Sequence, residues 1–422
     1  MDKMADVLGR AGAWCGQNKY LSAIKNAFQN FMPLTIAGAI GVLWCNVLVN
    51  DQTGLGLFFK PIMALDFLNP AFQAVNFCTI SCITVGITLG IAQEIGVWNM
   101  GAERAGYIPG LVGLAAWLSV TNTSHMVDGA KEAFTGIAGN ELGATGLFTG
   151  MIIGVLSVEL FCFFEKQDAL KIKMPEQVPP GVARAFEVLV PATITLIITA
   201  CIGSACYNLT GLYLNDVIKN GIQGPLGAVG ATIPGVMIIY LVIMLFWLVG
   251  IHGNNMLSAV KEALFTPLAL ENVEAFNKHQ TPKNIINMYA LQMWGEFGGS
   301  GVTIGLVIAI MIFGKREDNK AIATLSLVPG LFNINETVTF GIPMVLNPIL
   351  GIPFVVAPLI TIIIGYVLTV IGFCPVACLT VPWTCPSLIF GFLATGANIM
   401  GAVTQAILIA ISVVIYTPFL IS

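Results

Sequence analysis

The chain has 422 residues, of which 56% are hydrophobic and only 9% are charged, and its formal net charge is -4. A soluble domain carries roughly 25% charged residues, so this composition excludes an ordinary soluble fold and predicts a polytopic membrane protein. The sequence has no basic tract, and a net charge this small gives no reason to expect nucleic acid as a partner.

We expect an all-α fold, because a helix needs about 20 mostly apolar residues to cross a bilayer. The first half contains five such stretches, at 31–49, 74–92, 106–120, 143–164 and 186–208. The second half contains four, at 231–251, 286–313, 351–373 and 398–420. Shorter apolar pieces are interrupted by Gly and Pro, which predicts re-entrant hairpins or half-helices at 253–270, 325–349 and 376–396. The pattern predicts nine or ten spans.

A polar stretch at 209–230 predicts the boundary between an N-terminal half, 1–215, and a C-terminal half, 225–422. Lys and Arg residues gather at 3–25, 166–184 and 315–320. Loops rich in Lys and Arg stay in the cytoplasm. Because four predicted spans separate the first two clusters, we expect a cytoplasmic N-terminus. The polar N-terminal segment does not read as a signal peptide, which favours a bacterial inner-membrane protein.

The segment 327–350 contains the most informative polar residue. Glu336 lies in an otherwise apolar run, next to Asn335. The run is interrupted by Gly330, Gly341, Pro343 and Pro348, and it also contains Asn333. A charge in a membrane segment is costly, and transporters place substrate sites where helices are broken. The segment therefore predicts a functional site.

Two more polar patches interrupt apolar stretches. His252 follows an apolar span in GIHGNN, before Asn254, and glycines beside it permit close approach of a ligand. Glu296 precedes a glycine cluster that includes Gly298 and Gly299. Each patch has a structural alternative, a hydrogen-bonded core histidine in one case and tight helix packing through small residues in the other.

Aromatic residues accompany these polar groups. Trp247 lies at the end of one predicted span, and Trp383 lies in the broken segment near the C-terminus. An aromatic platform with a few convergent polar groups suits the apolar faces and hydroxyl rim of a sugar. No two of the ten cysteines form a C-x-x-C pair, and the carboxylates do not cluster at metal-ligand spacing. We therefore predict no metal site and no cofactor.

Over nearly its whole length the chain resembles the membrane (IIC) component of phosphotransferase-system sugar permeases, in the lactose, cellobiose and N,N′-diacetylchitobiose family. Each stretch that carries the resemblance is a weak motif alone, but five of them in family order are specific. They are MPEQVPPGVARAF (174–186), GIHG (250–253), GGSG (298–301), PGLFNINE followed by FGIPMVLNPI (329–349), and PWTCPSLIFGFLATG (382–396).

The resemblance implies a glucose-superfamily fold of about ten spans with two re-entrant hairpins. It implies a homodimer held by the N-terminal half, and an elevator-like movement of the C-terminal half with a bound disaccharide. It further implies that a cytosolic IIB protein phosphorylates the sugar C6 hydroxyl from a phosphocysteine. We expect IIB and IIA as separate chains, because no soluble stretch of suitable length is present.

Carried over by motif, His252 and Glu336 would contact the hydroxyl that receives the phosphoryl group, and Trp383 would pack on a sugar ring. Weaker assignments as sugar contacts go to Trp247, Asn254, Asn335, Glu296, Gly298 and Gly299. The base role of Glu336 is a hypothesis, since binding alone would also explain this residue.

Thr337 stands where the family has a proline after N-I-N-E. This departure and the unusual residues beside GIHG and GGSG leave the sugar undetermined. A proton- or cation-coupled sugar transporter, with Glu336 as its coupling site, is the main alternative. A membrane enzyme without transport is a weaker one, because no nucleophile or metal constellation is present.

Overall fold

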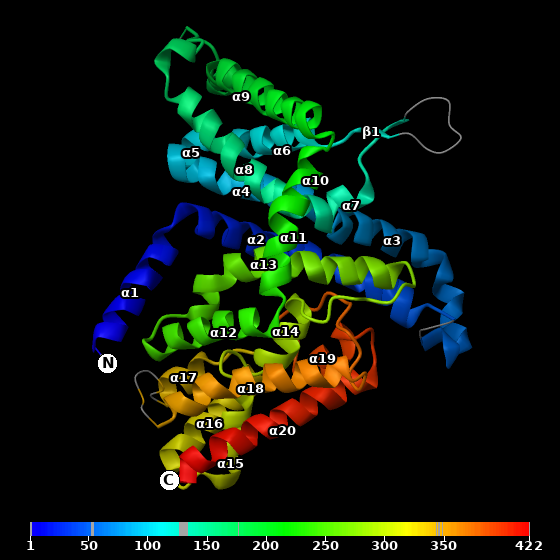
Figure 1. Cartoon of the computed structure of the whole chain (residues 1–422), viewed down its shortest axis with the longest axis vertical. Coiled ribbons are helices and arrows are strands. Elements are labelled where there is room, and N and C mark those ends of the chain that lie inside the picture. The colour runs from blue at the N-terminus through cyan, green and yellow to red at the C-terminus, as the bar shows by residue number, and fades with distance from the viewer. Residues whose placement is uncertain are drawn as a thin grey trace. The chain divides into compact units, whose positions relative to one another are not determined.

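The computed structural model describes residues 2–51, 55–125, 134–175, 177–342, 344, 347 and 349–421. Most of these residues are helical, and they include one antiparallel ribbon of β1 (Ser124–His125) and β2 (Phe134–Thr135) (Figure 1). Pro343 and Pro348 of the predicted broken segment lie outside the described residues. The predicted all-α class is confirmed.

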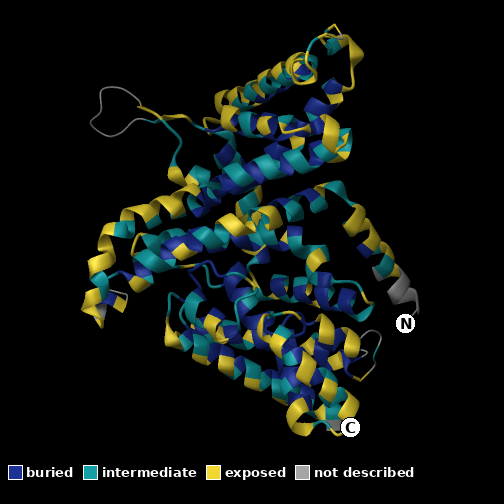
Figure 2. Cartoon of the chain, turned by 180° about the vertical axis from the view of Figure 1, so that it is seen from behind, coloured by how far each residue is buried: buried dark blue, intermediate teal, exposed yellow. Residues whose placement is uncertain are grey.

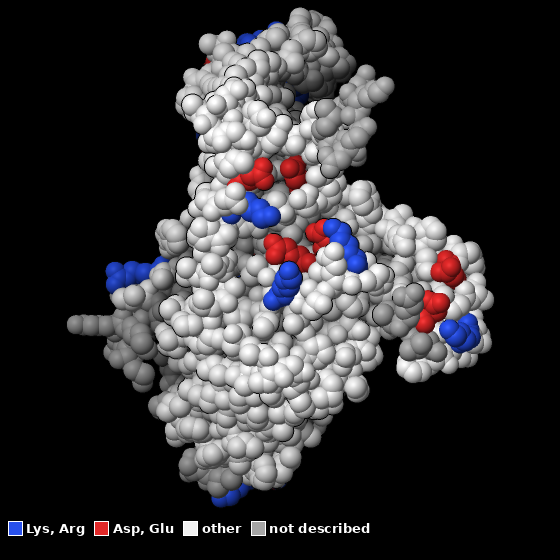
Figure 3. All heavy atoms as spheres, turned by 45° about the vertical axis from the view of Figure 1, so that its right-hand side comes forward, with Lys and Arg blue, Asp and Glu red and all other residues white. Residues whose placement is uncertain are grey.

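Six helices in the described ranges are long and apolar enough to cross a membrane: Lys19–Leu48, Lys60–Met100, Ala144–Glu165, Pro180–Thr210, Gly351–Val370 and Ile399–Leu420. Another pair, Leu214–Gly230 and Ile233–Leu248, bends by 76° and makes a seventh if it forms one span. Figure 2 shows exposed residues along many helices, and Figure 3 shows broad areas without charge. Exposed apolar surface of this kind suits contact with lipid.

The chain divides into two compact units. Unit 1 comprises Met1–Gln17, Thr35–Asn76 and Gly227–Ser422, and unit 2 comprises Asn18–Leu34 and Phe77–Leu226. The last division between the units, after Leu226, falls within the stretch 209–230 that was predicted as the boundary. The halves predicted at 1–215 and 225–422 differ from the units in one respect, because 1–17 and 35–76 belong with the C-terminal residues.

Unit 2 is built around α4, α6, α8 and α9, which pack on one another. Trp117 of α6 is fully buried in its core, beside Ala116, Val120 and Ile153. Glycine allows close helix contact, since a Cβ on Gly113 would overlap the side chain of Ala92. The elements of unit 2 are η4 (Ile80–Cys82), α4 (Ile83–Met100), α5 (Ala102–Ala105), α6 (Ile108–Val120), β1 and β2, α7 (Gly139–Leu142), α8 (Ala144–Glu165), η5 (Asp168–Leu170), α9 (Pro180–Thr210), α10 (Leu214–Ile218) and η6 (Lys219–Gln223). Helix α2 (Lys19–Leu43) contributes to both units.

Unit 1 contains long helices together with several short ones. Helix α20 packs on α15, α18 and α19, and α12 packs on α13 and α18. The elements in this unit or at its borders are α1 (Asp2–Gln17), η1 (Trp44–Leu48), η2 (Leu55–Leu57), η3 (Lys60–Leu68), α3 (Asn69–Cys78), α11 (Gly224–Gly230), α12 (Ile233–Leu248), α13 (Gly253–Asn277), α14 (Met288–Gly295), α15 (Ile304–Phe313), α16 (Glu317–Leu331), α17 (Glu336–Gly341), α18 (Gly351–Val370), α19 (Ile389–Ala394) and α20 (Ile399–Ile421).

Two predictions about broken segments in unit 1 are wrong. The stretch 253–270, predicted as a broken piece, lies in the continuous 25-residue helix α13. The stretch 286–313, predicted as one span, forms the two short helices α14 and α15. The break between them follows from Gly298, Gly299 and Gly301, whose φ angles are 71°, 88° and 82°. These left-handed conformations end a helix, and glycine adopts them without steric cost.

The break predicted within 325–349 is confirmed. Helix α16 ends at Leu331 and the short helix α17 begins at Glu336. Asn333, between them, has a φ of 63°. This conformation is uncommon outside glycine, but asparagine is among the residues that tolerate it. The turn places Glu336 in the first turn of α17.

Candidate functional site

His252 occupies the turn between α12 and α13. Gly250, with a φ of 82°, reverses the chain after α12. His252 is then the N-cap residue of α13, and its Nδ1 accepts a hydrogen bond from the backbone N–H of Asn255 at 3.2 Å. Because Nδ1 is an acceptor, a neutral imidazole in this position carries its proton on Nε2. The other ring nitrogen is therefore a donor toward Glu336.

Glu336 faces the imidazole from the start of α17. Its Oε1 lies 3.6 Å from Nε2 of His252, and the two side chains are 47% and 36% exposed, respectively. This separation is longer than a good N–H···O hydrogen bond, which spans about 2.7–3.2 Å. An open donor and an open acceptor at this spacing can bind one hydroxyl group between them. The structure places the two residues side by side, and their contact with a sugar hydroxyl stays a prediction.

Trp247 lies behind the imidazole rather than at an open surface. Its side chain is only 1% exposed. Its ring centroid is 4.4 Å from that of His252, and the rings of Phe340 and Phe354 pack at 6.3 and 6.4 Å. The arrangement fixes the orientation of His252 by packing. Direct contact between Trp247 and a sugar stays a prediction.

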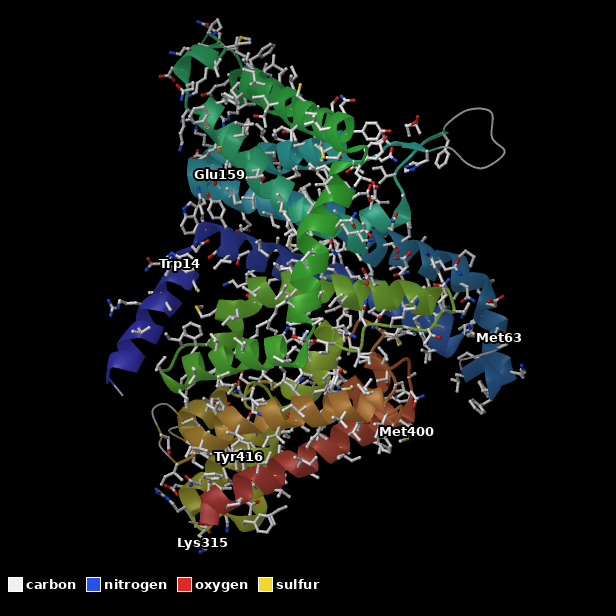
Figure 4. The ribbon with its side chains drawn as sticks, viewed as in Figure 1. Trp14, Met63, Glu159, Lys315, Met400 and Tyr416 are labelled. Atoms are coloured by element: carbon white, nitrogen blue, oxygen red, sulfur yellow. The ribbon has the colours of Figure 1, made fainter. Side chains whose placement is uncertain are left out.

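The glycine loop between α14 and α15 packs against the turn that carries Glu336. A Cβ on Gly299 would lie 2.7 Å from the Cβ of Asn335. The buried side chain of Asn335 donates from Nδ2 to the carbonyl of Ser300 at 2.9 Å. Tyr416, labelled in Figure 4, donates its hydroxyl to the carbonyl of Gly301 in the same loop at 2.7 Å. The glycines thus act by close packing in this structure.

Asn333 connects this loop to the segment that contains Trp383. Its Oδ1 accepts a hydrogen bond from the N–H of Gly298 at 2.7 Å. Its Nδ2 donates to the carbonyl of Trp383, and also to that of Cys385 at 3.1 Å. The side chain of Trp383 is 45% exposed, which leaves its ring open to a ligand. The structure therefore joins three loops that are distant in sequence.

Glu296 and Asn254 are bonded to other protein groups. Glu296 forms a buried ion pair with Lys261 and accepts the hydroxyl of Tyr240 at 2.7 Å. Asn254 accepts from Lys261 Nζ at 3.1 Å and donates to Ser300 Oγ at 2.9 Å. Sequence analysis missed Lys261 and Tyr240. Lys261 could have been noticed as an isolated lysine that follows the polar GIHGNN turn (250–255) by six residues.

A cavity of about 460 Å³ lies elsewhere in unit 1. Its described lining comes from 41–76 and from Asn277 and His279, and includes none of the predicted site residues. Asn46 and Asn277 bond to each other across it at 3.1 Å. In the parts of the chain that the structure describes, no group of three or more His, Cys, Asp or Glu side chains could hold a metal ion.

Comparison with known proteins identifies the family. The family model described as "Phosphotransferase system, EIIC" matches residues 25–358. The chain belongs to this family. The resemblance read from the five motifs is thereby confirmed, and the protein is a membrane component of a sugar phosphotransferase system.

Relatives of this EIIC chain match it nearly end to end. It is 33% identical over 424 residues to the "PTS system oligo-beta-mannoside-specific EIIC component" of Bacillus subtilis (strain 168), covering 99% of this chain and 93% of the relative. It is 30% identical over 478 residues to the "PTS system cellobiose-specific EIIC component" of Lactococcus lactis subsp. lactis (strain IL1403), covering 99% and 97%.

A solved structure is similar in fold. The crystal structure of the transporter ChbC, the IIC component from the N,N′-diacetylchitobiose-specific phosphotransferase system, superposes with a TM-score of 0.88 at 30% identity. The match covers 97% of this EIIC chain and 94% of that chain. At this coverage the likeness extends over both compact units.

Proposed function

We propose that the chain binds a β-linked disaccharide, moves it across the bacterial inner membrane and presents its C6 hydroxyl for phosphorylation. The observation that carries this proposal is the open pair of His252 Nε2 and Glu336 Oε1 at 3.6 Å. Relatives named for cellobiose, oligo-β-mannosides and N,N′-diacetylchitobiose support the substrate class.

The pair can orient and activate a hydroxyl group. A hydroxyl oxygen between the two side chains accepts the Nε2–H of His252 and donates its own proton to Glu336. In the proposed reaction that oxygen bonds to the phosphorus of a phosphocysteine on a IIB protein. The phosphorus–sulfur bond breaks, the cysteine leaves as a thiolate, and the proton passes to Glu336. General-base help of this kind contributes about 10²–10⁴-fold to a rate.

Other predicted residues would bind the rest of the sugar. The exposed ring of Trp383 offers a platform for the apolar face of a pyranose. The remaining predicted residues bind or pack against protein groups, which favours a supporting role over direct contact with the sugar. They are Trp247, Asn254, Asn335, Glu296, Gly298 and Gly299. Trp383 therefore has the strongest claim to a sugar contact after the His252–Glu336 pair.

The transport step is proposed as an elevator-like movement. All predicted site residues belong to unit 1, so one compact body would carry the bound sugar. The helix breaks between α14 and α15 and between α16 and α17 support two re-entrant hairpins among about ten spans. We further propose a homodimer, a cytoplasmic N-terminus, and separate IIA and IIB partners, as the family resemblance implies.

Labelled disaccharide in membrane vesicles tests the function. With phosphoenolpyruvate and the cytosolic phosphotransferase proteins, we expect phosphorylated disaccharide inside the vesicles and no accumulation without phosphoenolpyruvate. Unmodified sugar that accumulates until a protonophore is added would instead favour a proton-coupled transporter with Glu336 as its coupling site.

Glu336→Gln separates the base role from simple binding. Glutamine retains an acceptor oxygen but cannot take the proton, so we expect binding to survive while phosphorylation falls by about 100-fold or more. Equilibrium binding and initial phosphorylation rates are the measurements. Phosphorylation at a near wild-type rate would leave Glu336 as a contact residue only.

A further inference from the structure

Lys261 and Glu296 are charged groups in the interior of unit 1. Their side chains are 7% and 15% exposed, and they form an ion pair. Removing two charges from water is costly, so a buried pair contributes little to stability relative to apolar residues of the same size. A structural or functional constraint is the better explanation for such a pair.

The pair continues into a chain of hydrogen bonds. Besides Glu296, Lys261 Nζ donates to Asn254 Oδ1 at 3.1 Å, one heptad earlier on α13. The two ends of the Asn254 amide thus have different partners, because Nδ2 donates to Ser300 Oγ at 2.9 Å. A lysine ammonium can only donate, so it fixes which way the amide of Asn254 points.

This series of hydrogen bonds ends at Asn335, the residue before Glu336. Asn335 Nδ2 donates to the backbone carbonyl of Ser300 at 2.9 Å and to Thr339 Oγ1 at 3.1 Å. The sequence Glu296–Lys261–Asn254–Ser300–Asn335 therefore links α13, the glycine loop and α17. His252, the N-cap of α13, lies two residues before Asn254 in the middle of this link, and Glu336, the first residue of α17, directly follows Asn335 at its end.

We propose that Lys261 and Glu296 are positioning residues that hold Glu336 opposite His252 through Asn254, Ser300 and Asn335. The inference rests on the proposed function, because the pair is positioned for the hydroxyl that receives the phosphoryl group. Neither charged residue touches the sugar. Their loss should impair recognition of that hydroxyl more than binding of the remaining sugar.

The test compares a disaccharide with its 6′-deoxy derivative. The probe is whichever of cellobiose, lactose, N,N′-diacetylchitobiose or β-1,4-mannobiose binds the wild-type protein most tightly in calorimetry. Hydrogen bonds to charged groups correspond to about 10- to 100-fold in affinity, so the wild type should prefer the parent sugar by that ratio. No preference in the wild type would contradict the proposed function at this hydroxyl.

The variant that tests this link is the double substitution Lys261→Met with Glu296→Gln, which removes both charges together and leaves neither unpaired. We expect its preference for the parent sugar to fall below about threefold, while affinity for the deoxy sugar stays within about threefold of wild type. The matched control is Lys278→Met with Glu274→Gln, the same change at an exposed pair at the C-terminal end of α13. That control should behave as wild type.

Further variants cover the case in which the double variant fails to fold. Asn254→Ala interrupts the link between Lys261 and Ser300 and leaves the ion pair intact. It should lower the preference for the parent sugar in the same way. Lys261→Arg keeps a charged donor and should retain most of the preference. A wild-type preference ratio in either the double variant or Asn254→Ala would overturn the inference, because a purely structural role changes both affinities together.

Discussion

Gly299→Ala probes the contact between the glycine loop and the turn that carries Glu336. At a φ of 88°, an alanine Cβ would lie 2.7 Å from the Cβ of Asn335 and 2.9 Å from the carbonyl oxygen of Asn333. A left-handed residue with a Cβ costs about 1–2 kcal/mol. Overpacking adds about 1–3 kcal/mol. We therefore expect a loss of about 2–5 kcal/mol in unfolding free energy.

The displaced turn should also bind sugar less well. Because Asn335 directly precedes Glu336, we expect disaccharide affinity to fall by about tenfold or more. Thermal unfolding in detergent and titration calorimetry measure the two effects. Gly227→Ala is the control, since Gly227 lies in α11 with no atom within 4 Å of the added Cβ. If Gly299→Ala unfolds at the control's temperature and binds within twofold of it, the packing argument is refuted.

Two further predictions concern single aromatic residues. Trp383→Ala should lower disaccharide affinity with little change in unfolding temperature, because its side chain is 45% exposed. Trp247→Ala should instead destabilise the protein by about 3–5 kcal/mol, since its ring is buried; equal stability losses in the two variants would contradict this contrast. Tyr416→Phe should cost about 1–3 kcal/mol by leaving the carbonyl of Gly301 without its donor. Denaturant unfolding checks this value, and an unchanged midpoint would argue against it.

The plain membrane helices could be predicted closely from the sequence. The stretches 231–251, 351–373 and 398–420 correspond to α12, α18 and α20 within a few residues. A continuous apolar run is sufficient to form such a helix in a bilayer, where every backbone group must bond internally. Local composition was therefore the deciding factor at these positions.

The break at 296–303 could not be predicted in this way. The run 286–313 is as apolar as a single span, and glycine alone is compatible with both close helix packing and a left-handed turn. The choice depends on Phe354 and Asn335, which pack against Gly301 and Gly299 from distant parts of the chain. In the opposite error, at 253–270, the charge of Lys261 is compensated by Glu296, which lies outside α13.

The sequence motifs predicted the exposed residues of the candidate site but not the buried residues that pack behind them. His252 and Glu336 were paired through the family motifs, and the structure brings them to 3.6 Å. Lys261 was overlooked because its importance comes from Glu296 and Asn254, contacts that exist only after folding. Motifs identify the groups that meet a substrate, whereas the groups that hold them in place depend on tertiary packing.

The side chain of Asn333 bonds to the glycine loop and to the backbone on both sides of Thr384. In apolar surroundings, a loop that moved away alone would leave these amide and carbonyl groups without partners. The three segments must therefore shift together or not at all. If a sugar binds among them, the three segments would close around it in one cooperative step rather than by independent loop movements.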